Sequence, residues 1–238
     1  MTTRFSPTPS GRLHLGHLYL ALINYHTAAR EGGRFIVRFD DLDFPELQSL
    51  GRDKVNEFCE TIKEEFSWMG MKVDLYSHTA KEHETNLQYL SGVPGLEKDD
   101  GIKWSRPFVR NEDRPYPFIP LITAIKVVQD HREGCNIIIR GEDLVSESSL
   151  YYYFCRLLGF VPPKLCYIPK LIQRDGQDLS DMSKTRGNFK IKDYRERGYA
   201  PQDVLNLLAE ACLEKSDGGW YVENTKKNPV LDKPYWEQ

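Results

Sequence analysis

Two short segments of this 238-residue chain carry residue types that suit phosphate chemistry. Residues 14–17 (His-Leu-Gly-His) place two imidazoles and a glycine where a helix is expected to begin. The first turn of a helix carries unpaired N–H groups and a partial positive charge, so it favours phosphate oxygens. Much later, residues 183–184 (Ser-Lys) add a cation that can approach the same phosphates. The two segments predict an enzyme whose reaction includes attack on the α-phosphate of ATP. His14, His17 and Lys184 would stabilise the negative charge that accumulates on the phosphate oxygens.

Each segment is weak evidence alone. An isolated His-x-Gly-His can be an ordinary helix start with two incidental histidines, and a lysine on a polar loop is usually only solvated. The residues before the histidines change this balance, because they form a proline-rich approach that contains Arg4, Phe5, Pro7, Pro9 and Gly11. The approach, and the order of the two segments, favour the interpretation as a phosphate site.

Charged residues follow two of the expected strands. Residues 40–43 (Asp-Asp-Leu-Asp) come after an apolar strand at 34–39, and Arg140 ends an isoleucine-rich strand that begins at 136. Ligands of parallel sheets bind at the carboxyl ends of the strands. The aspartates alone could bind Mg²⁺, cap the next helix or pair with arginines, and capping is the plainest of these. Arg140 could equally pair with the acidic residues that follow it.

Residues 4–17 and 181–184 together resemble the two signature sequences of class I aminoacyl-tRNA synthetases. Residues 38–41 (Arg-Phe-Asp-Asp) and 140–143 (Arg-Gly-Glu-Asp) resemble further motifs of the glutamyl- and glutaminyl-tRNA synthetase family. The resemblance covers residues 3–213. It implies that ATP and an amino acid condense to an aminoacyl adenylate and pyrophosphate, with Mg²⁺ accompanying ATP.

The resemblance also implies roles for individual residues. The catalytic residues would be His14, His17 and Lys184. The ATP contacts would be Pro7, His14, Gly16, His17, Glu142, Asp143, Met182, Ser183 and Lys184. The amino-acid contacts would be Arg4, Ser6, Thr8, Asp40, Ile122 and Arg140. Asp40 would bind the α-ammonium group, and Arg4 and Arg140 the side-chain carboxylate, which a planar guanidinium suits. The two arginines favour glutamate or a close acidic analogue.

Three positions depart from the family pattern. Asp181 stands where the second signature usually has a lysine, and Thr185 where an arginine often follows, although Arg186 can restore some charge. Ile122 replaces a tyrosine of the amino-acid pocket, which removes a hydrogen bond of about 1 kcal/mol; Tyr116 could compensate. A catalytically impaired binding or regulatory paralogue therefore remains an alternative. A nucleotidylyltransferase is disfavoured, because it would lack the Ser-Lys and Arg-Gly-Glu-Asp segments.

The hydrophobic pattern predicts how these residues are positioned. A strand at 2–6, a helix that ends near residues 32–33 and a strand at 34–39 form a right-handed crossover between parallel strands. Further helices are expected at 47–69 and 146–158. The fold class is therefore α/β, and the resemblance implies a class I synthetase Rossmann-like core with about five parallel strands.

Later segments are less regular. Helices are expected at 191–197 and 201–213, the second with Pro201 at its start. Residues 170–188 are polar and contain glycine, so the Ser-Lys segment is expected on a mobile loop. The tail at 214–238 has no clear periodicity.

The family implies a tRNA-binding insert between the two halves of the core and anticodon-binding domains after it. The chain predicts a catalytic core at 1–213, with a shortened insertion at about 83–117, a C-terminal tail at 214–238 and no anticodon-binding domain. A truncated paralogue of this kind, glutamyl-queuosine tRNA(Asp) synthetase, usually has a cysteine-rich zinc cluster in the insertion. No cysteine lies between residues 60 and 134, so that cluster is not expected. The acyl acceptor stays open between tRNA, a small molecule and a carrier protein.

Composition limits the possible partners and compartment. Thirty-two basic and 35 acidic residues give a net charge of −3, so no overall positive field indicates nucleic acid. Local basic candidates are Lys190, Lys192, Arg195, Arg197, Lys226 and Lys227. The five scattered cysteines predict a reducing cytosol with no structural zinc or other metal site. No apolar run approaches the roughly 20 residues of a membrane span, so we expect a cytoplasmic protein without a membrane partner.

Overall fold

The computed structural model describes residues 1–42, 45–91, 93, 97–98, 108–110, 118–182, 189–215 and 219–232. Its centre is a set of parallel strands: β1 (Thr2–Phe5), β2 (Arg34–Phe39) and β3 (Leu75–His78) form one sheet in the order β1-β2-β3. The strands β7 (Ile137–Gly141) and β8 (Lys164–Ile168) form a second parallel pair. These elements confirm the α/β fold class and the parallel sheet.

The two sheets meet side by side, with β7 next to β1. The backbone N–H of Asn136 donates to the carbonyl of Thr2 at 3.2 Å, and the N–H of Thr2 donates to Asn136 Oδ1 at 2.9 Å. The spatial order is therefore β3-β2-β1-β7-β8. This arrangement brings the carboxyl ends of β1 and β7 together.

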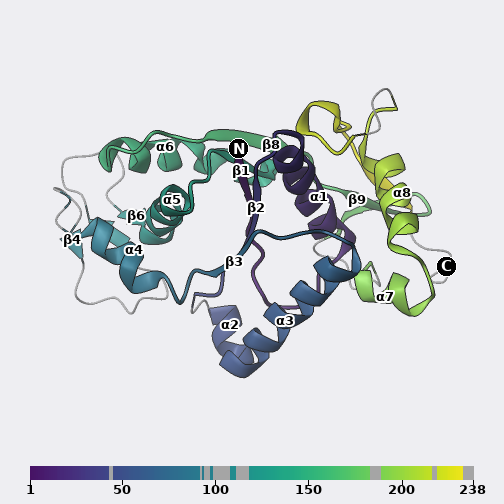
Figure 1. Cartoon of the computed structure of the whole chain (residues 1–238), viewed down its shortest axis with the longest axis horizontal. Helices are drawn as coiled ribbons and strands as arrows, with labels where there is room; N and C mark the ends of the chain where they lie inside the picture. Colours follow the sequence, from purple (N-terminus) through teal and green to yellow (C-terminus); the bar gives the residue numbers. More distant parts are fainter. Residues whose placement is uncertain are drawn as a thin grey trace.

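Helices cover both faces of the sheet because alternate residues of β2 point to opposite sides. Phe35, Val37 and Phe39 are buried in one core with α1 (Leu15–Arg30) and α3 (Arg52–Trp68). Ile36 is buried in the other core, with α5 (Leu121–Glu133) and α6 (Ser148–Leu157). Figure 1 shows the strands between these two groups of helices.

The helix expected at 47–69 is wrong in one respect: the structure has two helices, α2 (Pro45–Leu50) and α3. Gly51 separates them with a φ of 79°, a left-handed conformation that favours glycine. The helix expected at 146–158 is confirmed as α6, preceded by the short 3₁₀ helix η1 (Glu142–Glu147). The predicted α1, α7 (Ile191–Glu196) and α8 (Pro201–Cys212) are also confirmed.

Part of the polar segment at 170–188 forms a hairpin, whereas the Ser-Lys residues expected on a loop lie outside the described residues. Strands β9 (Ile172–Asp175) and β10 (Asp178–Asp181) pair antiparallel. The tail adds the 3₁₀ helix η3 (Val222–Asn224) and then β11 (Val230–Asp232), which pairs parallel with β9. These strands were missed because they are short and polar, and their pairing depends on partners distant in the sequence.

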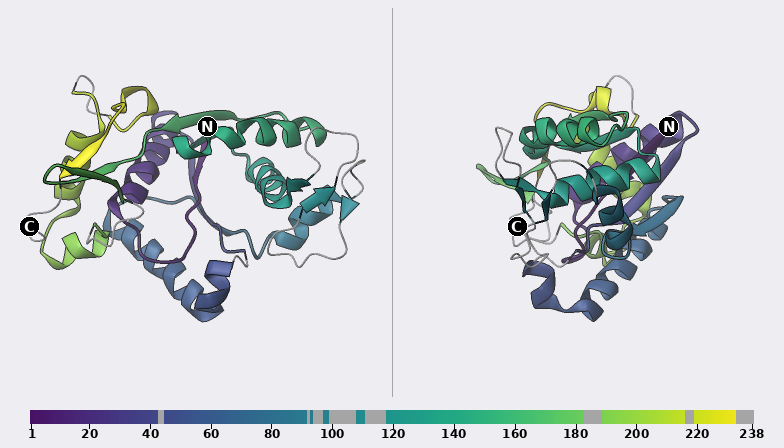
Figure 2. Two further views of the ribbon diagram at one scale, coloured as in Figure 1. Left: turned by 180° about the vertical axis from the view of Figure 1, so that it is seen from behind. Right: turned by 90° about the vertical axis from the view of Figure 1, so that its left-hand side faces the viewer.

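The expected insertion lies largely outside the described residues. Its described parts are α4 (His83–Leu90) and the two short strands β4 (Glu97–Lys98) and β5 (Phe108–Arg110), which form an antiparallel sheet with β6 (Phe118–Pro120). Figure 2 shows from behind that these elements lie beside α5 and α6, on the opposite side of the central strands from α7 and α8.

In the part of the chain that the structure describes, no helix is both long enough and apolar enough to cross a membrane. All five cysteines are free thiols; four are buried and Cys166 is half-buried.

Candidate active site

The two signature histidines begin α1 and are fixed by backbone hydrogen bonds. Nδ1 of His14 accepts from the N–H groups of Gly16 at 3.1 Å and His17 at 3.4 Å, and Nδ1 of His17 accepts from the N–H of His14 at 3.4 Å. The two rings stack with centroids 3.6 Å apart. Because Nδ1 accepts in both rings, each neutral imidazole carries its proton on Nε2. The signature therefore supplies two N–H donors.

Burial keeps both imidazoles neutral. It lowers the pKa of His14 to about 4. Burial, together with the neighbouring His14, lowers the pKa of His17 to about 3. At neutral pH these side chains donate hydrogen bonds without carrying full positive charges.

Gly16 allows this arrangement. A Cβ atom at this position would lie 3.0 Å from Cε1 of His14, and 3.8 Å from Sδ of Met182. The first distance is tighter than most real contacts, so any larger residue would push the His14 ring away. The second distance shows that Met182, in the second signature, lies close to Gly16 in the first.

A pocket of about 460 Å³ opens beside the histidines. It is formed by the end of β1 and the segment that leads to α1, by the ends of β7 and β8, and by Met182. Of the predicted site residues, the lining contains Arg4, Ser6, Pro7, Thr8, His14, Gly16, His17, Arg140, Asp143 and Met182. Residues from both halves of the chain thus share one cavity.

Other predicted site residues lie elsewhere. Asp40, Ile122 and Glu142 are described but are not in the lining; Glu142 accepts a hydrogen bond from the backbone N–H of Lys170 at 3.4 Å. Ser183 and Lys184 lie outside the described residues, as do Asp43, Tyr116, Thr185 and Arg186.

Arg140 reaches the pocket from the end of β7 and is almost fully buried. Its Nη2 donates to Tyr167 Oη at 3.1 Å, and its Nη1 lies 3.7 Å from Glu147. Its closest acidic partner is therefore Glu147, and not Glu142 or Asp143. Its Nε, and Oγ of Ser6 in the same lining, are buried and have no hydrogen-bond partner among the described residues. Buried polar atoms of this kind need a partner, which can be a ligand, an ion or a water molecule.

Arg4 lines the pocket but is held by an internal carboxylate. Its Nε donates to Asp130 at 2.8 Å and its Nη2 at 3.3 Å. Asp130 also lies 2.8 Å from Nη2 of Arg38 and accepts a hydrogen bond from Tyr151 Oη. Burial opposes ionisation of Asp130, but the charges of Arg38 and Arg4 outweigh it and lower its pKa to about 2. Sequence reasoning missed this network because no local pattern links its members.

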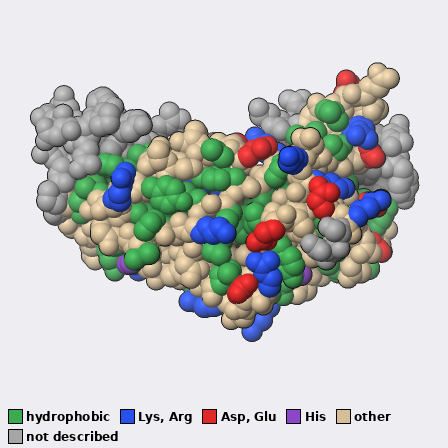
Figure 3. Space-filling view, turned by 90° about the horizontal axis from the view of Figure 1, so that it is seen from above, with side chains coloured by type: hydrophobic (Ala, Val, Ile, Leu, Met, Phe, Trp, Pro, Cys, Tyr) green, Lys and Arg blue, Asp and Glu red, His purple; other side chains and the backbone are tan. Residues whose placement is uncertain are grey.

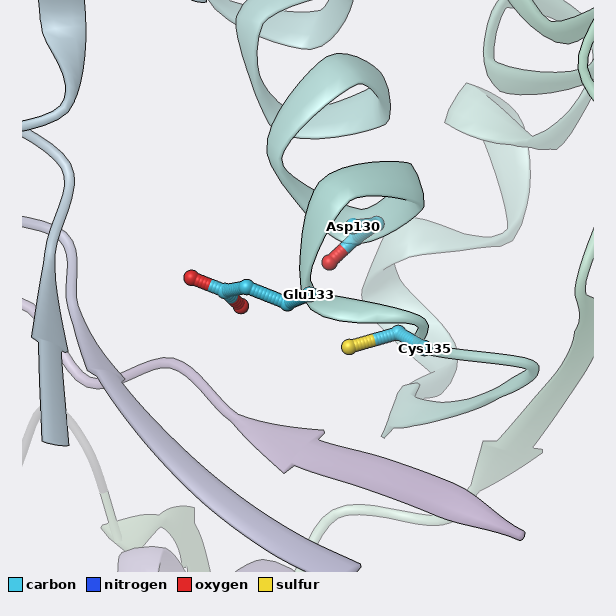
Figure 4. A group of neighbouring side chains, drawn as sticks. All are labelled: Asp130, Glu133 and Cys135. Carbon is cyan, nitrogen blue, oxygen red and sulfur yellow. The ribbon is translucent and has the colours of Figure 1, made fainter. Parts of the chain in front are cut away.

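Asp130, Glu133 and Cys135 lie close enough to suggest a metal site (Figure 4). The two carboxylates already bind cations, since Arg38 contacts both of them. Glu133 also accepts hydrogen bonds from Ser77 and Gln129. Burial raises the pKa of the Cys135 thiol to about 12, so it is not a thiolate at neutral pH. The group is better explained as a buried ion-pair network than as a metal site.

The first two aspartates after β2 have different partners among the described residues. The backbone N–H of Asp40 donates to the carbonyl of Pro7 at 3.0 Å, and its Oδ2 lies 2.8 Å from Nζ of Lys126. Asp41 accepts the backbone N–H of Ala80 and contacts His78. Sequence reasoning did not identify Lys126 as the partner of Asp40.

A second missed residue, Glu65 of α3, supports the approach to the histidines. Its Oε2 accepts the backbone N–H of Leu13 at 3.1 Å, and Oε1 lies 3.6 Å from Arg12. Burial raises the pKa of Glu65 to about 7. The sequence signal that could have identified Glu65 was its position, as a charged residue, beside the apolar face of the helix predicted at 47–69.

On the face shown in Figure 3, the basic and acidic side chains of the described residues are interspersed. Lys192, one of the predicted basic candidates, pairs with Glu196 at 3.2 Å.

Solved structures show which known fold this chain shares. A glutamate tRNA ligase from Elizabethkingia meningosepticum, in complex with its amino acid, matches 97% of this chain and 66% of its own, with a TM-score of 0.71 and 18% identity. The methionyl-tRNA synthetase of Mycobacterium tuberculosis bound by methionyl-adenylate matches with a TM-score of 0.64 and 10% identity. The fold is that of a class I aminoacyl-tRNA synthetase core.

Sequence comparisons point to one branch of this class. Residues 1–93 match the catalytic domain of class I tRNA synthetases of the E and Q type. The glutamate–tRNA ligase 1 of Petrotoga mobilis is 25% identical over 87% of this chain, and that of Campylobacter hominis 28% over 90%. These matches confirm the resemblance to the glutamyl- and glutaminyl-tRNA synthetase family. The chain spans 54% and 58% of the lengths of these two relatives.

Proposed function

We propose that this protein activates glutamate or a close acidic analogue with ATP. A carboxylate oxygen of the acid attacks the α-phosphorus, the bond from this phosphorus to the bridging oxygen of pyrophosphate breaks, and an acyl adenylate forms. One observation carries the proposal: a single pocket is lined by the two signature histidines and by Arg140, a buried residue from the second half of the chain whose Nε has no partner among the described residues.

The pocket divides this work between its two sides. His14 and His17 donate hydrogen bonds to the α-phosphate oxygens, where negative charge grows in the transition state. Arg140 binds a carboxylate of the acid, because its planar guanidinium matches that group. Lys184, which lies outside the described residues, adds a cation for the leaving phosphates.

Mg²⁺ would enter with the nucleotide. Mg²⁺ in such sites keeps several waters and is held mainly by phosphates, with one or two carboxylates. Asp143 is a carboxylate in the described lining and suits this role. The ion would neutralise charge on the phosphates; the positioning of the acid and the α-phosphate depends on Arg140 and the histidines.

Acid-dependent exchange of pyrophosphate into ATP tests the proposal. Wild-type protein should support exchange with an acid of this class, and His17→Ala should reduce the rate about 100- to 1,000-fold, as expected for loss of one transition-state donor. Lys184→Ala should also lower the rate without unfolding the protein. His26→Ala is the matched control, because His26 lies on the same helix and is not in the pocket lining. Absence of exchange with every acid, with and without tRNA, would contradict adenylate formation.

Asp181 and Ile122 favour a second candidate, a catalytically impaired paralogue that binds ATP or an acid as a regulatory or scaffolding protein. Such a protein would bind ATP in calorimetry and show no exchange.

The acyl acceptor is a separate question. We propose transfer to tRNA or, alternatively, to a small molecule or carrier protein. If exchange occurs and labelled acid never reaches any tRNA, the second acceptor class is favoured.

A further inference from the structure

Leu13, the residue before the first signature histidine, is held by two elements that are distant in the sequence. Its backbone N–H donates to Oε2 of Glu65 on α3 at 3.1 Å. Its carbonyl accepts the backbone N–H of Ile191, at the start of α7, at 3.1 Å. Both polar groups of this backbone unit are therefore satisfied, one by a carboxylate and one by the main chain.

The same contact region reaches the segment that carries the Ser-Lys residues. The N–H of Leu15 donates to the carbonyl of Phe189 at 2.8 Å, and His14 and Lys190 form an antiparallel bridge between the two stretches. At the other end of residues 183–188, Met182 lies close to Gly16. The start of α1 thus contacts the residues on both sides of the Ser-Lys segment, and the support of Leu13 affects both signatures.

Glu65 is a buried carboxylate in cationic surroundings. Its side chain is 5% exposed, and its Oε1 lies 3.6 Å from Nη1 of Arg12. The small cavity beside it is also lined by Lys192 and Arg195 of α7 and by Glu64 of α3. Among the described residues of this lining, three cations thus offset the charge of two carboxylates. An ionised carboxylate accepts a stronger hydrogen bond from an N–H group than a neutral oxygen does, which suits Glu65 to hold Leu13.

Loss of this hydrogen bond would be transmitted to the histidine rings. Leu13 is 1% exposed, so without Glu65 its N–H would be buried and unsatisfied. The backbone can avoid this cost by moving until the N–H meets water. His14 is the next residue, and its own N–H is the group that donates to Nδ1 of His17. Movement at Leu13 therefore displaces the hydrogen bonds that orient both rings.

We propose that Glu65 is a positioning residue for the histidine pair, because by binding Leu13 it fixes the backbone that orients His14 and His17 in the pocket. Glu65 does not line the pocket and acts only through Leu13. This inference rests on the proposed function and deepens it: Glu65 serves the chemical step at the phosphate and leaves binding of the acid to the other side of the pocket.

Exchange kinetics give the first test. Glu65→Leu removes the acceptor, so kcat should fall about tenfold, while KM for the acid should stay within about twofold of wild type. Glu65→Gln retains an acceptor oxygen and should keep kcat within about threefold of wild type. Glu60→Leu is the matched control, because Glu60 is an exposed residue of α3 that pairs with Lys63. A folded Glu65→Leu protein with wild-type kcat, or with an effect confined to KM, would overturn the proposal.

If Glu65→Leu does not fold, Glu65→Asp provides the comparison. It retains the charge but is shorter by one methylene group, which withdraws the carboxylate from Leu13. Its kcat should fall below that of Glu65→Gln, although Gln is the uncharged residue. The reverse order would show that the charge of Glu65 matters and its hydrogen bond to Leu13 does not, and this would overturn the proposal.

Titration of the histidines by NMR, without any substrate, separates this inference from the proposed function. Burial lowers the pKa of His14 to about 4, so its ring in wild type should stay neutral down to about pH 5. In Glu65→Leu the displaced ring gains water, and its pKa should rise above about 5; Glu60→Leu should match wild type. A shifted titration in a protein that shows no exchange would defeat adenylate formation and support the positioning role. An unchanged titration in folded Glu65→Leu would overturn the positioning role, even where wild-type protein supports exchange.

Discussion

The two sides of the pocket are held in different ways. On the side proposed for the nucleotide, His14 and His17 are fixed by hydrogen bonds to backbone groups two or three residues away. On the side proposed for the acid, Arg4 is fixed by Asp130, which is 126 positions away. The hydrogen bonds that orient the two histidine rings are thus local, although Glu65 of α3 supports the segment before them, whereas the orientation of Arg4 depends directly on a distant element.

The largest expected effect tests the long-range support of the acid side. Asp130→Asn leaves Arg4 and Arg38 buried without their shared countercharge, so the free energy of unfolding should fall by about 3–5 kcal/mol. Denaturant unfolding measures this change. Asp178→Asn, at an exposed position of β10, should change stability little. Equal stability of the two variants would show that the network does not support the acid side.

The next effect separates binding of the acid from the chemical step. Arg140→Ala removes charged hydrogen bonds of about 1.5–3 kcal/mol, so KM for the acid should rise roughly 10- to 150-fold while kcat changes less. Arg140→Lys should not restore KM, because an ammonium cannot make two parallel hydrogen bonds to a carboxylate. Steady-state exchange kinetics measure both constants. A fall in kcat alone would place Arg140 on the nucleotide side.

A smaller effect tests the local hydrogen bonds that orient the two histidine rings. In Gly16→Ala, the new Cβ atom would crowd Cε1 of His14 at 3.0 Å and displace the ring. We expect the exchange rate to fall about tenfold, equivalent to one weakened hydrogen bond of about 1.4 kcal/mol, with the fold retained. Gly11→Ala is the matched control, since its Cβ would meet nothing within 4 Å. Equal rates in the two variants would show that the ring position is unimportant.

The last prediction concerns the pH dependence of stability. Burial lowers the pKa of His17 in the folded protein to about 3, compared with an ordinary value of 6.5. The unfolded chain therefore binds the extra proton first as pH falls, and this histidine makes wild type lose stability between pH 6.5 and about 3. His17→Gln should lose less stability over that range in thermal unfolding at several pH values. Parallel curves for the two proteins would argue against a buried, neutral His17.

The same contrast explains what could be predicted from sequence. The start of α1, the buried β2 and the histidine pair depend on neighbours along the chain, so periodicity and short motifs were enough. The break at Gly51 was also visible in principle, because glycine is favoured at a positive φ. The pairing of β11 with β9 and the contact of Lys126 with Asp40 depend on the tertiary fold. Asp40 was therefore correctly placed at the end of a strand, and its partner could not be foreseen.

Acid-dependent pyrophosphate exchange by wild-type protein tests the central claim most directly, when glutamate and glutarate are compared in parallel with the His17→Ala variant. The expected result is exchange that requires an acid and falls about 100-fold or more in the variant. Exchange that is absent with every acid tested, or that is equal in wild type and His17→Ala, would contradict the assignment of this pocket to acid activation.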